Sequence, residues 1–424
     1  MISNVINSGD TAWVLASAAL VLFMTPGLAI FYGGMVRAKS VLNMMMMSFS
    51  AMGVTTVIWV LYGYSLAFGK SNGGLIGNFD HVGLANTLDQ VTGSEGHQIP
   101  ALAFAMFQLT FAIITVALLS GAIADRAKFS SWIIFVAVWI TLVYLPIAHW
   151  AFASQSGEGG WIIDHLGALD FAGGTVVEIN SGATALALAL VLGKREGFKT
   201  ESMRPHNMPL VLLGAGMLWF GWFGFNAGSA LSAGSLAATA MINTQVATAA
   251  AAMSWVLLER FRDGKATTLG IASGAIAGAV AITPACGYVN PLGALLIGLI
   301  AGALSAMAVS RKYKWGYDDS LDVVGVHGVG GILGMLAIGF LATTTANAVG
   351  GNGLLMNGGT ALLGRQVTAI LATAAFSFTA TWLIAKVISK TIGFRATRED
   401  ELTGLDTTYH AESAYDISGN ANRY

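Results

Sequence analysis

The chain has 424 residues, of which 55% are hydrophobic and only 10% are charged, against about a quarter in an ordinary soluble domain. Its 21 Lys and Arg nearly balance its 22 Asp and Glu, which leaves a net charge of −1 at pH 7. These values exclude a disordered chain, a nucleic-acid binder that works through bulk positive charge, and a soluble enzyme, and they indicate a protein whose solvent is lipid.

Continuous apolar segments recur along the whole chain. A helix needs about 20 apolar residues to span the hydrocarbon core, and the runs are continuous rather than alternating, so a β-barrel is not expected. We therefore expect an all-α membrane protein with eleven transmembrane helices, of which the eighth is the shortest. These helices are expected near residues 11–36, 41–69, 100–124, 130–152, 171–193, 207–229, 238–258, 267–286, 290–309, 321–345 and 361–391.

Lys and Arg concentrate on one side of the expected helices. Nineteen of the 21 follow the odd-numbered helices, and only Lys70 and Arg365 lie on the other side. Positive residues favour the cytoplasmic side of a membrane. The sequence therefore predicts that the N-terminus lies outside and the C-terminus inside, as an odd number of spans requires.

A weak internal repeat links the first and sixth expected helices. Both contain the spacing Gly-x-x-x-Phe-x-x-Gly, at 27–34 and at 221–228. An odd number of spans in each half makes such a repeat inverted in the membrane, with the substrate path at the interface of the halves.

Two ionisable residues lie inside expected spans, which makes them candidate functional residues. Glu178 lies eight residues beyond Asp170 and therefore about 12 Å deeper along a helix. His327 lies in the tenth helix, at the position that the repeat pairs with the fifth. If the two side chains meet, they form a proton-accepting and cation-attracting pair with coupled titrations. The alternatives are a carboxylate that pairs only with helix ends or hydroxyls, and a core histidine with a structural role.

Aromatic residues form a third group of candidates. Aromatic faces attract cations and stacked rings can close a pore by dewetting, although such residues more often pack in the core or face lipid. The candidates in the third, fourth and sixth helices are Phe107, Phe111, Trp150, Phe152, Trp219, Trp222 and Phe225.

Enzyme motifs do not compete with this interpretation. The sequence has no Walker A loop, no His-Glu-x-x-His motif, no nucleophile elbow and no metal-spaced cysteine cluster. We expect neither an enzyme nor a bound metal or cofactor. Asp318 and Asp319 lie in a basic loop, and we expect them to be surface charges.

Four longer strings resemble the ammonium transporter family (Amt/Mep/Rh): residues 31–37, 170–180, 222–229 and 322–328. The resemblance covers essentially the whole chain. It implies a multi-pass protein of the cell (inner or plasma) membrane that carries ammonium or methylammonium. It also implies an inverted five-plus-five helix repeat and a homotrimer with one pore in each subunit.

The resemblance also divides the chain. Residues 1–391 would form the membrane domain, and residues 392–424 resemble the family's cytosolic regulatory tail. In the family this tail packs on the cytosolic face and can meet PII-type nitrogen-signalling proteins.

The motifs carry the family's site residues onto this chain. The resemblance implies an outer site that recruits ammonium, a gate of two stacked phenylalanines and a pore with two histidines. In this sequence the gate is Phe111 and Phe225, the recruiting residues are Ser229 and Asp170, Phe107 and Trp222 line the same region, and the second pore histidine is His327.

Two positions depart from the family pattern. Glu178 stands where the family usually has the first pore histidine, and Phe152 stands where the outer site usually has a tryptophan. The expected function is transport in which ammonium is deprotonated and conducted past a Glu178–His327 pair with movement of charge. An ammonium sensor with little flux and a passive channel for neutral ammonia are the alternatives.

Overall fold

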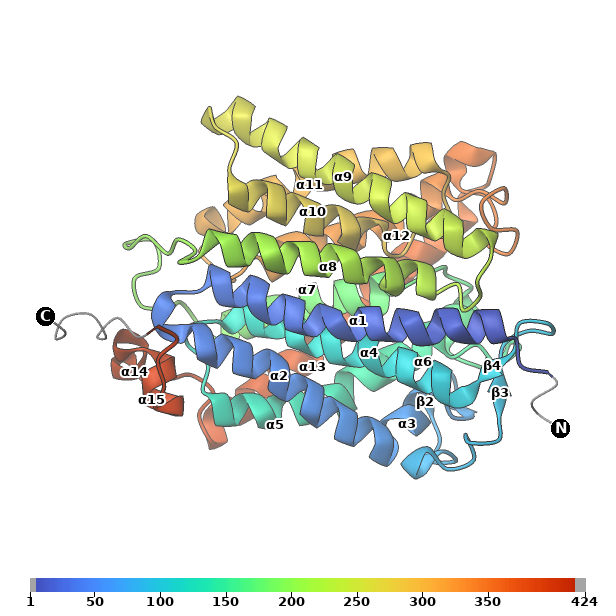
Figure 1. The fold of residues 1–424 in the computed structure, drawn as a ribbon, viewed down its shortest axis with the longest axis horizontal. Coiled ribbons are helices and arrows are strands. Elements are labelled where there is room, and N and C mark those ends of the chain that lie inside the picture. The colour runs from blue at the N-terminus through green and yellow to red at the C-terminus, as the bar shows by residue number, and fades with distance from the viewer. Residues whose placement is uncertain (1–4, 416–424) are drawn as a thin grey trace, which may run out of the picture.

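The computed structural model describes residues 5–415, which form a bundle of long helices running between two ends of the molecule (Figure 1). Within this part of the chain, ten helical stretches are long and apolar enough to cross a membrane. An eleventh, α10 (Thr268–Ile282), is apolar but only 15 residues long. The predicted eighth segment is therefore a short helix, and the others are full-length.

Several spans are built from more than one helical piece. Two π-helical turns, η3 (Trp59–Gly63) and η6 (Ile140–Tyr144), continue α2 into α3 and α5 into α6, and two more, η8 (Gly174–Ile179) and η9 (Val324–Gly328), begin the spans of α7 and α12. The bundle consists of α1 (Ser8–Met35), α2 (Val41–Ile58), α3 (Tyr64–Phe68), α4 (Ala101–Leu119), α5 (Phe129–Trp139), α6 (Leu145–Phe152), α7 (Asn180–Leu192), α8 (Met208–Gly228), α9 (Ser235–Asp263), α10, α11 (Pro291–Trp315), α12 (Val329–Leu341) and α13 (Ala361–Thr391). Shorter helical turns are η2 (Ala38–Ser40), η4 (Val82–Leu84), η5 (Ser120–Ile123), η7 (Trp161–Leu166) and η10 (Leu354–Met356).

The expected all-helical membrane fold is confirmed, and the loop between α3 and α4 adds two small strand pairs to it. Both pairs are antiparallel, with two residues per strand. These are β1 (Ser71–Asn72) with β2 (Ile76–Gly77), and β3 (Val91–Thr92) with β4 (Ile99–Pro100). Strands this short leave no alternation of apolar and polar residues, so hydropathy does not predict them.

Helices α1 and α8 run antiparallel and side by side along the middle of the bundle (Figure 1). A side chain added at Gly34 would collide with the backbone of Asn207, and one at Gly228 would collide with Ser17. Glycine is therefore required at both ends of this contact, because the two helices approach almost to backbone distance.

The segment after α13 folds against the end of the bundle that carries the basic loops. It contains α14 (Arg398–Thr403) and α15 (Leu405–His410). Asp406 accepts hydrogen bonds from the backbone N–H groups of Leu42 (3.0 Å) and Asn43 (2.8 Å), and so caps the start of α2. Residues 416–424 of the predicted tail, which include Arg423, lie outside the described residues.

Candidate functional site

A narrow cavity lies inside the bundle between α1, α4, α8, α10 and the segments η8 and η9. Most of its wall is apolar, with side chains such as Met24, Leu28 and Ile114. Its polar lining includes Tyr32, Glu178, Ser273, Asp322 and His327. A mostly apolar lining with a few ionisable groups is the arrangement expected of a selective pore rather than of an open aqueous channel.

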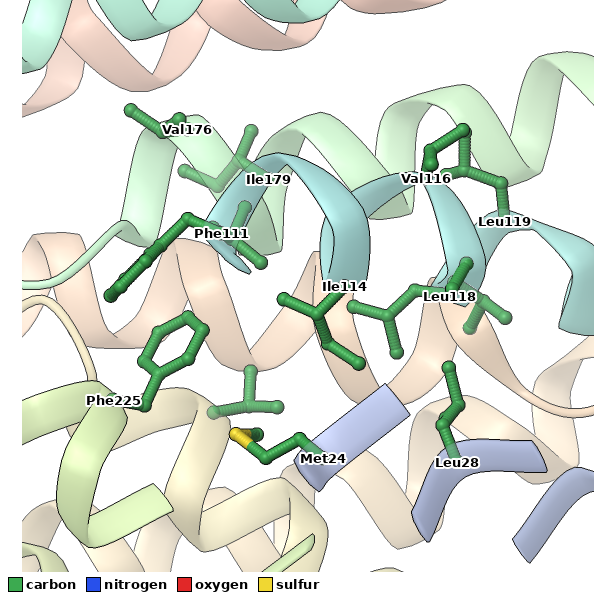
Figure 2. Close-up of a cluster of buried hydrophobic side chains, with 14 of the residues drawn as sticks. Met24, Leu28, Phe111, Ile114, Val116, Leu118, Leu119, Val176, Ile179 and Phe225 are labelled. Atoms are coloured by element: carbon green, nitrogen blue, oxygen red, sulfur yellow. The ribbon is translucent and has the colours of Figure 1, made fainter. Parts of the chain in front are cut away.

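Two phenylalanine rings pack against each other at the cavity, whose lining includes Phe225. The rings of Phe111 and Phe225 lie 4.3 Å apart between centroids with 32° between their planes, and both side chains are buried. Figure 2 shows the two rings facing each other, with Ile114 and Met24 beyond them. Phe107 and Phe152 contact Phe111 edge-on, at 4.9 and 6.4 Å. The structure thus brings four of the predicted aromatic residues into one cluster.

Glu178 and His327 meet in the wall of the cavity. The Nδ1 atom of His327 and the Oε2 atom of Glu178 are 2.7 Å apart and share a hydrogen bond across 149 residues of sequence. The side chains are only 1% and 5% exposed. The second carboxylate oxygen of Glu178, Oε1, has no hydrogen-bond partner within residues 5–415. The pair therefore offers one shared proton and one free acceptor in a site of low dielectric.

Each member of the pair lies eight residues after an aspartate that starts its helix. The carboxylate of Asp170 accepts hydrogen bonds from the N–H groups of residues 173, 174 and 175, at 2.8, 2.6 and 2.7 Å. The carboxylate of Asp319 accepts one from the N–H of Val324, at 2.7 Å. These bonds satisfy donors that a helix start leaves free, and they begin η8 and η9 inside the bundle.

Close backbone contact holds the two helix starts together. A side chain at Gly182 would overlap the backbone of Gly328, and one at Gly331 would lie 2.7 Å from Cβ of Glu178. Only glycine permits this approach, and the approach brings Glu178 within hydrogen-bond distance of His327.

The predicted outer residues Asp170 and Ser229 form hydrogen bonds with backbone groups close to them in sequence. Both carboxylate oxygens of Asp170 already accept backbone N–H groups, and the hydroxyl of Ser229 donates to the carbonyl of Phe225 at 2.8 Å. Asp170 and Ser229 make no hydrogen bond to each other in the described structure. The indole N–H of Trp222, which lines the cavity, donates to the hydroxyl of Thr283 at 2.9 Å. Trp150 lies elsewhere, because its indole donates to the carbonyl of Leu75.

The expectation that Asp318 and Asp319 are surface charges is wrong. Both are buried, at 0% and 1% exposed. Asp318 forms an ion pair with Arg195 at 2.8 Å, and although burial opposes its charge, this pair holds the pKa of Asp318 below its ordinary value. Burial raises the pKa of Asp319 to about 6, despite the nearby charge of Lys312. The local sequence does not predict this burial, because it depends on tertiary contacts: Asp318 pairs with Arg195, and Asp319 lies at the start of η9, the helix that carries His327.

Tyr32 is a cavity residue that the sequence did not single out for a role. Its hydroxyl donates to the carbonyl of Leu118 at 3.1 Å, and the residue lines the cavity together with Asp322. Its position within the string 31–37 was the available indication.

Known proteins share this architecture. Residues 12–415 match the model of the Ammonium Transporter Family. An ammonium transporter of Mycobacterium tuberculosis is 53% identical to this chain, over 98% of this chain and 92% of that protein. The crystal structure of Saccharomyces cerevisiae Mep2 superposes with a TM-score of 0.86 at 34% identity, covering 94% of this chain and 92% of that one. A solved structure described as a sensor Amt protein gives a TM-score of 0.88 at 30% identity and covers 96% of this chain and 100% of its own.

Proposed function

The chain belongs to the ammonium transporter family and is a multi-pass protein of the cell membrane, and from this premise we propose that its cavity conducts ammonium past Glu178 and His327 with movement of charge. The observation that carries the proposal is the buried 2.7 Å hydrogen bond between these side chains, beside a carboxylate oxygen that lacks a partner. A carboxylate can take a proton from ammonium or attract the intact cation, and a neutral pair of imidazoles does neither as strongly.

The path begins at the aromatic cluster. Ammonium meets the faces of Phe107 and Phe152 near the Ser229 hydroxyl, where cation–π attraction favours a cation that has shed water. Asp170 contributes through its negative charge, since its oxygens are occupied by backbone N–H groups. The stacked rings of Phe111 and Phe225 then exclude bulk water from the pore.

Deprotonation and conduction follow at the buried pair. Glu178 occupies the position at which the family usually has a histidine, so the proton acceptor here is an acid–imidazole pair. If one charge crosses with each ammonium, the membrane potential supplies about 2.3 kcal/mol per 100 mV. At 100 mV this energy supports about a 50-fold difference in ammonium concentration across the membrane.

The internal contacts support an inverted five-plus-five repeat. Gly34 of α1 packs at Val211, and the repeat-related Gly228 of α8 packs at Ser17. Gly182 lies against the backbone of η9, and the matching Gly331 lies against the backbone of η8. Such reciprocal contacts are expected from a two-fold axis in the membrane plane.

Charge placement supports an outside N-terminus and an inside C-terminus. The basic loops and the docked segment 392–415 occupy one end of the bundle, and positive residues favour the cytoplasm. In this orientation the regulatory tail lies at the cytosolic mouth of the pore. Assembly as a homotrimer and contact with a PII-type signalling protein complete the proposal, by analogy with the family.

One experiment separates transport from its alternatives. The purified protein is reconstituted in liposomes, and currents are recorded on pulses of ammonium, methylammonium and potassium. Ammonium currents larger than potassium currents are expected. Uptake of labelled methylammonium without current would replace the proposal with a passive channel. Binding with neither uptake nor current would assign the chain to a sensor, such as the solved structure described in those words.

A further inference from the structure

A second, smaller pocket lies next to the pore cavity, at the end of the bundle that carries the basic loops. The two cavities share the lining residues Met35, Leu321 and Asp322. About 80 Å³ of the second pocket is open to the centres of water molecules, and one water needs about 10–15 Å³. The pocket therefore has room for several waters or for one small solute. Its other charged lining residues are Arg37, Asp125, Arg195 and Lys312.

Two side chains of this pocket keep unused hydrogen-bonding atoms of opposite kind. The Nε atom of Arg37 donates to Oδ2 of Asp125 at 3.2 Å. The Nη2 atom of Arg37 and the Oδ1 atom of Asp125 are buried and have no partner within residues 5–415. The side chain of Asp125 is only 1% exposed. Because buried donors and acceptors are normally satisfied, the free pair suits a solute that accepts from the guanidinium and donates to the carboxylate.

The other charges around the pocket are paired with each other. Arg195 pairs with Asp318 at 2.8 Å, and Lys312 pairs with Asp322. Together with the pair described above, these ion pairs contain equal numbers of positive and negative groups. A simple anion or a simple cation would bring an uncompensated charge into this buried site, which is unfavourable, whereas a zwitterion would not.

Both acidic residues that line the pocket have a left-handed backbone. The φ angle is 65° at Asp125 and 66° at Asp322. Aspartate adopts this conformation more readily than most residues, and such positions cluster at ligand sites. The fold therefore holds both carboxylates at the pocket before a ligand arrives, so little order must be gained on binding.

An α-amino acid matches the spacing of the two free atoms. These atoms belong to one ion pair and so lie close together, which a ligand with widely separated charges would not match. In an α-amino acid the nitrogen and the nearer carboxylate oxygen are about 3 Å apart, as standard bond lengths require. One molecule can thus donate to Oδ1 of Asp125 and accept from Nη2 of Arg37. The apolar part of the wall, which can contact a short ligand side chain, includes Met203, Pro205 and Leu269.

We propose that this pocket binds a small α-amino acid as a zwitterion, with its carboxylate on Arg37 and its ammonium group on Asp125. In the proposed orientation the pocket lies on the cytosolic side. The ligand would lie beside Asp322, which also lines the pore cavity, and would slow the passage of ammonium. Reactions that add ammonium to carbon skeletons consume the transported solute and yield amino acids, so the site would couple uptake to their product. The effect on passage rests on the proposed function, whereas binding itself does not.

The test is isothermal titration calorimetry of the full-length protein in detergent, with L-alanine as the probe. Propionate and ethylammonium are the matched comparisons, because each keeps most of the alanine skeleton and lacks one of its two charged groups. Each comparison loses a hydrogen bond to a charged group of the protein. We therefore expect each to bind at least about 10-fold more weakly than L-alanine.

Three variants locate the binding. Arg37→Lys keeps the positive charge but lacks the free Nη2 atom, so it should bind L-alanine about 10-fold more weakly. Arg365→Lys makes the same change at an exposed arginine on the predicted opposite side and should bind as the unaltered protein does. Leu269→Trp fills the apolar side of the pocket and leaves every ion pair in place, so it should abolish binding even if the Arg37 variant does not fold. Heat that persists in Leu269→Trp comes from other sites and is subtracted.

Three results would overturn the proposal: propionate or ethylammonium that binds as tightly as L-alanine, an Arg37→Lys affinity within twofold of the unaltered protein, or no binding of L-alanine at millimolar concentrations. The last result would leave the pocket to ordered water.

The effect on passage has its own readout. Saturating L-alanine on both sides of the liposomes should reduce the ammonium current by at least half, and an unchanged current with intact binding would overturn the coupling to transport. Absence of ammonium current without L-alanine would count against the transport proposal and not against the binding site.

Discussion

Glu178→Gln removes the ionisable group of the buried pair while keeping the shape of the side chain. The amide oxygen of Gln can still accept the hydrogen bond that spans 2.7 Å to His327, whereas the free acceptor Oε1 becomes a donor or loses its charge. A hydrogen bond to a charged group is worth about 1.5–3 kcal/mol. If ammonium or its proton uses that free oxygen in the transition state, the ammonium current should fall about 10- to 150-fold.

The assay is the current that reconstituted protein gives on an ammonium pulse, normalised to the amount of folded protein. Glu158→Gln, which removes an exposed carboxylate from the loop between α6 and η7, is the matched control and should leave the current unchanged. A Glu178→Gln current within twofold of the unaltered protein would refute the role of the carboxylate. If labelled methylammonium uptake persists in Glu178→Gln while the current is lost, then Glu178 is required for the movement of charge and not for the passage of the substrate.

Three further predictions address the gate, the glycine contact and pH. Phe225→Ala should destabilise the protein by about 3–5 kcal/mol through loss of a buried ring. It should also raise the potassium current, and an unchanged ratio of potassium to ammonium current would contradict the role of Phe225 as a gate. Gly182→Val should force the backbone of Gly328 away, lower thermal stability by about 1–3 kcal/mol and abolish transport, whereas Gly216→Ala, which faces open space, should do neither. Burial raises the pKa of Asp319 from 3.8 to about 6. Between about pH 4 and pH 6 the folded protein therefore binds a proton that the unfolded chain does not. The free energy of unfolding increases by up to about 3 kcal/mol as pH falls from 7 to 4. Asp319→Asn should therefore be more stable than the unaltered protein at neutral pH, keep about half of that advantage at pH 5 and lose most of it near pH 4. An equal difference in thermal stability between the two proteins at pH 7 and pH 4 would contradict the assignment.

Hydropathy predicted the helices well because lipid imposes one length and one composition on every span. Its errors lie at helix ends. The fifth segment is predicted to begin at 171, but its helix begins at Gly174, because the carboxylate of Asp170 lies ahead of the helix and accepts the free N–H groups of residues 173 to 175 at its start. The ninth was expected to end at 309, but α11 continues through charged residues to Trp315.

The candidate site was predictable in its residue types and not in its geometry. Scarcity of charge made Glu178 and His327 conspicuous, and the repeat suggested that they correspond. Their 2.7 Å contact depends on two glycines that bring separate helix starts together, and no local pattern encodes that approach. Asp319 was misjudged for the same reason, since its loop looks solvated in sequence and is buried by the tertiary fold.

The contact between Gly182 and Gly328 has a kinetic consequence. Two halves that touch at backbone level cannot tilt against each other without separating their main chains, and the antiparallel contact of α1 with α8 opposes the same motion. Rocking of whole halves, which takes microseconds to milliseconds in other carriers, is therefore a costly way to admit substrate here. If Phe111 and Phe225 form the proposed gate, we expect rotation of these two side chains, rather than a domain hinge, to govern the rate of passage.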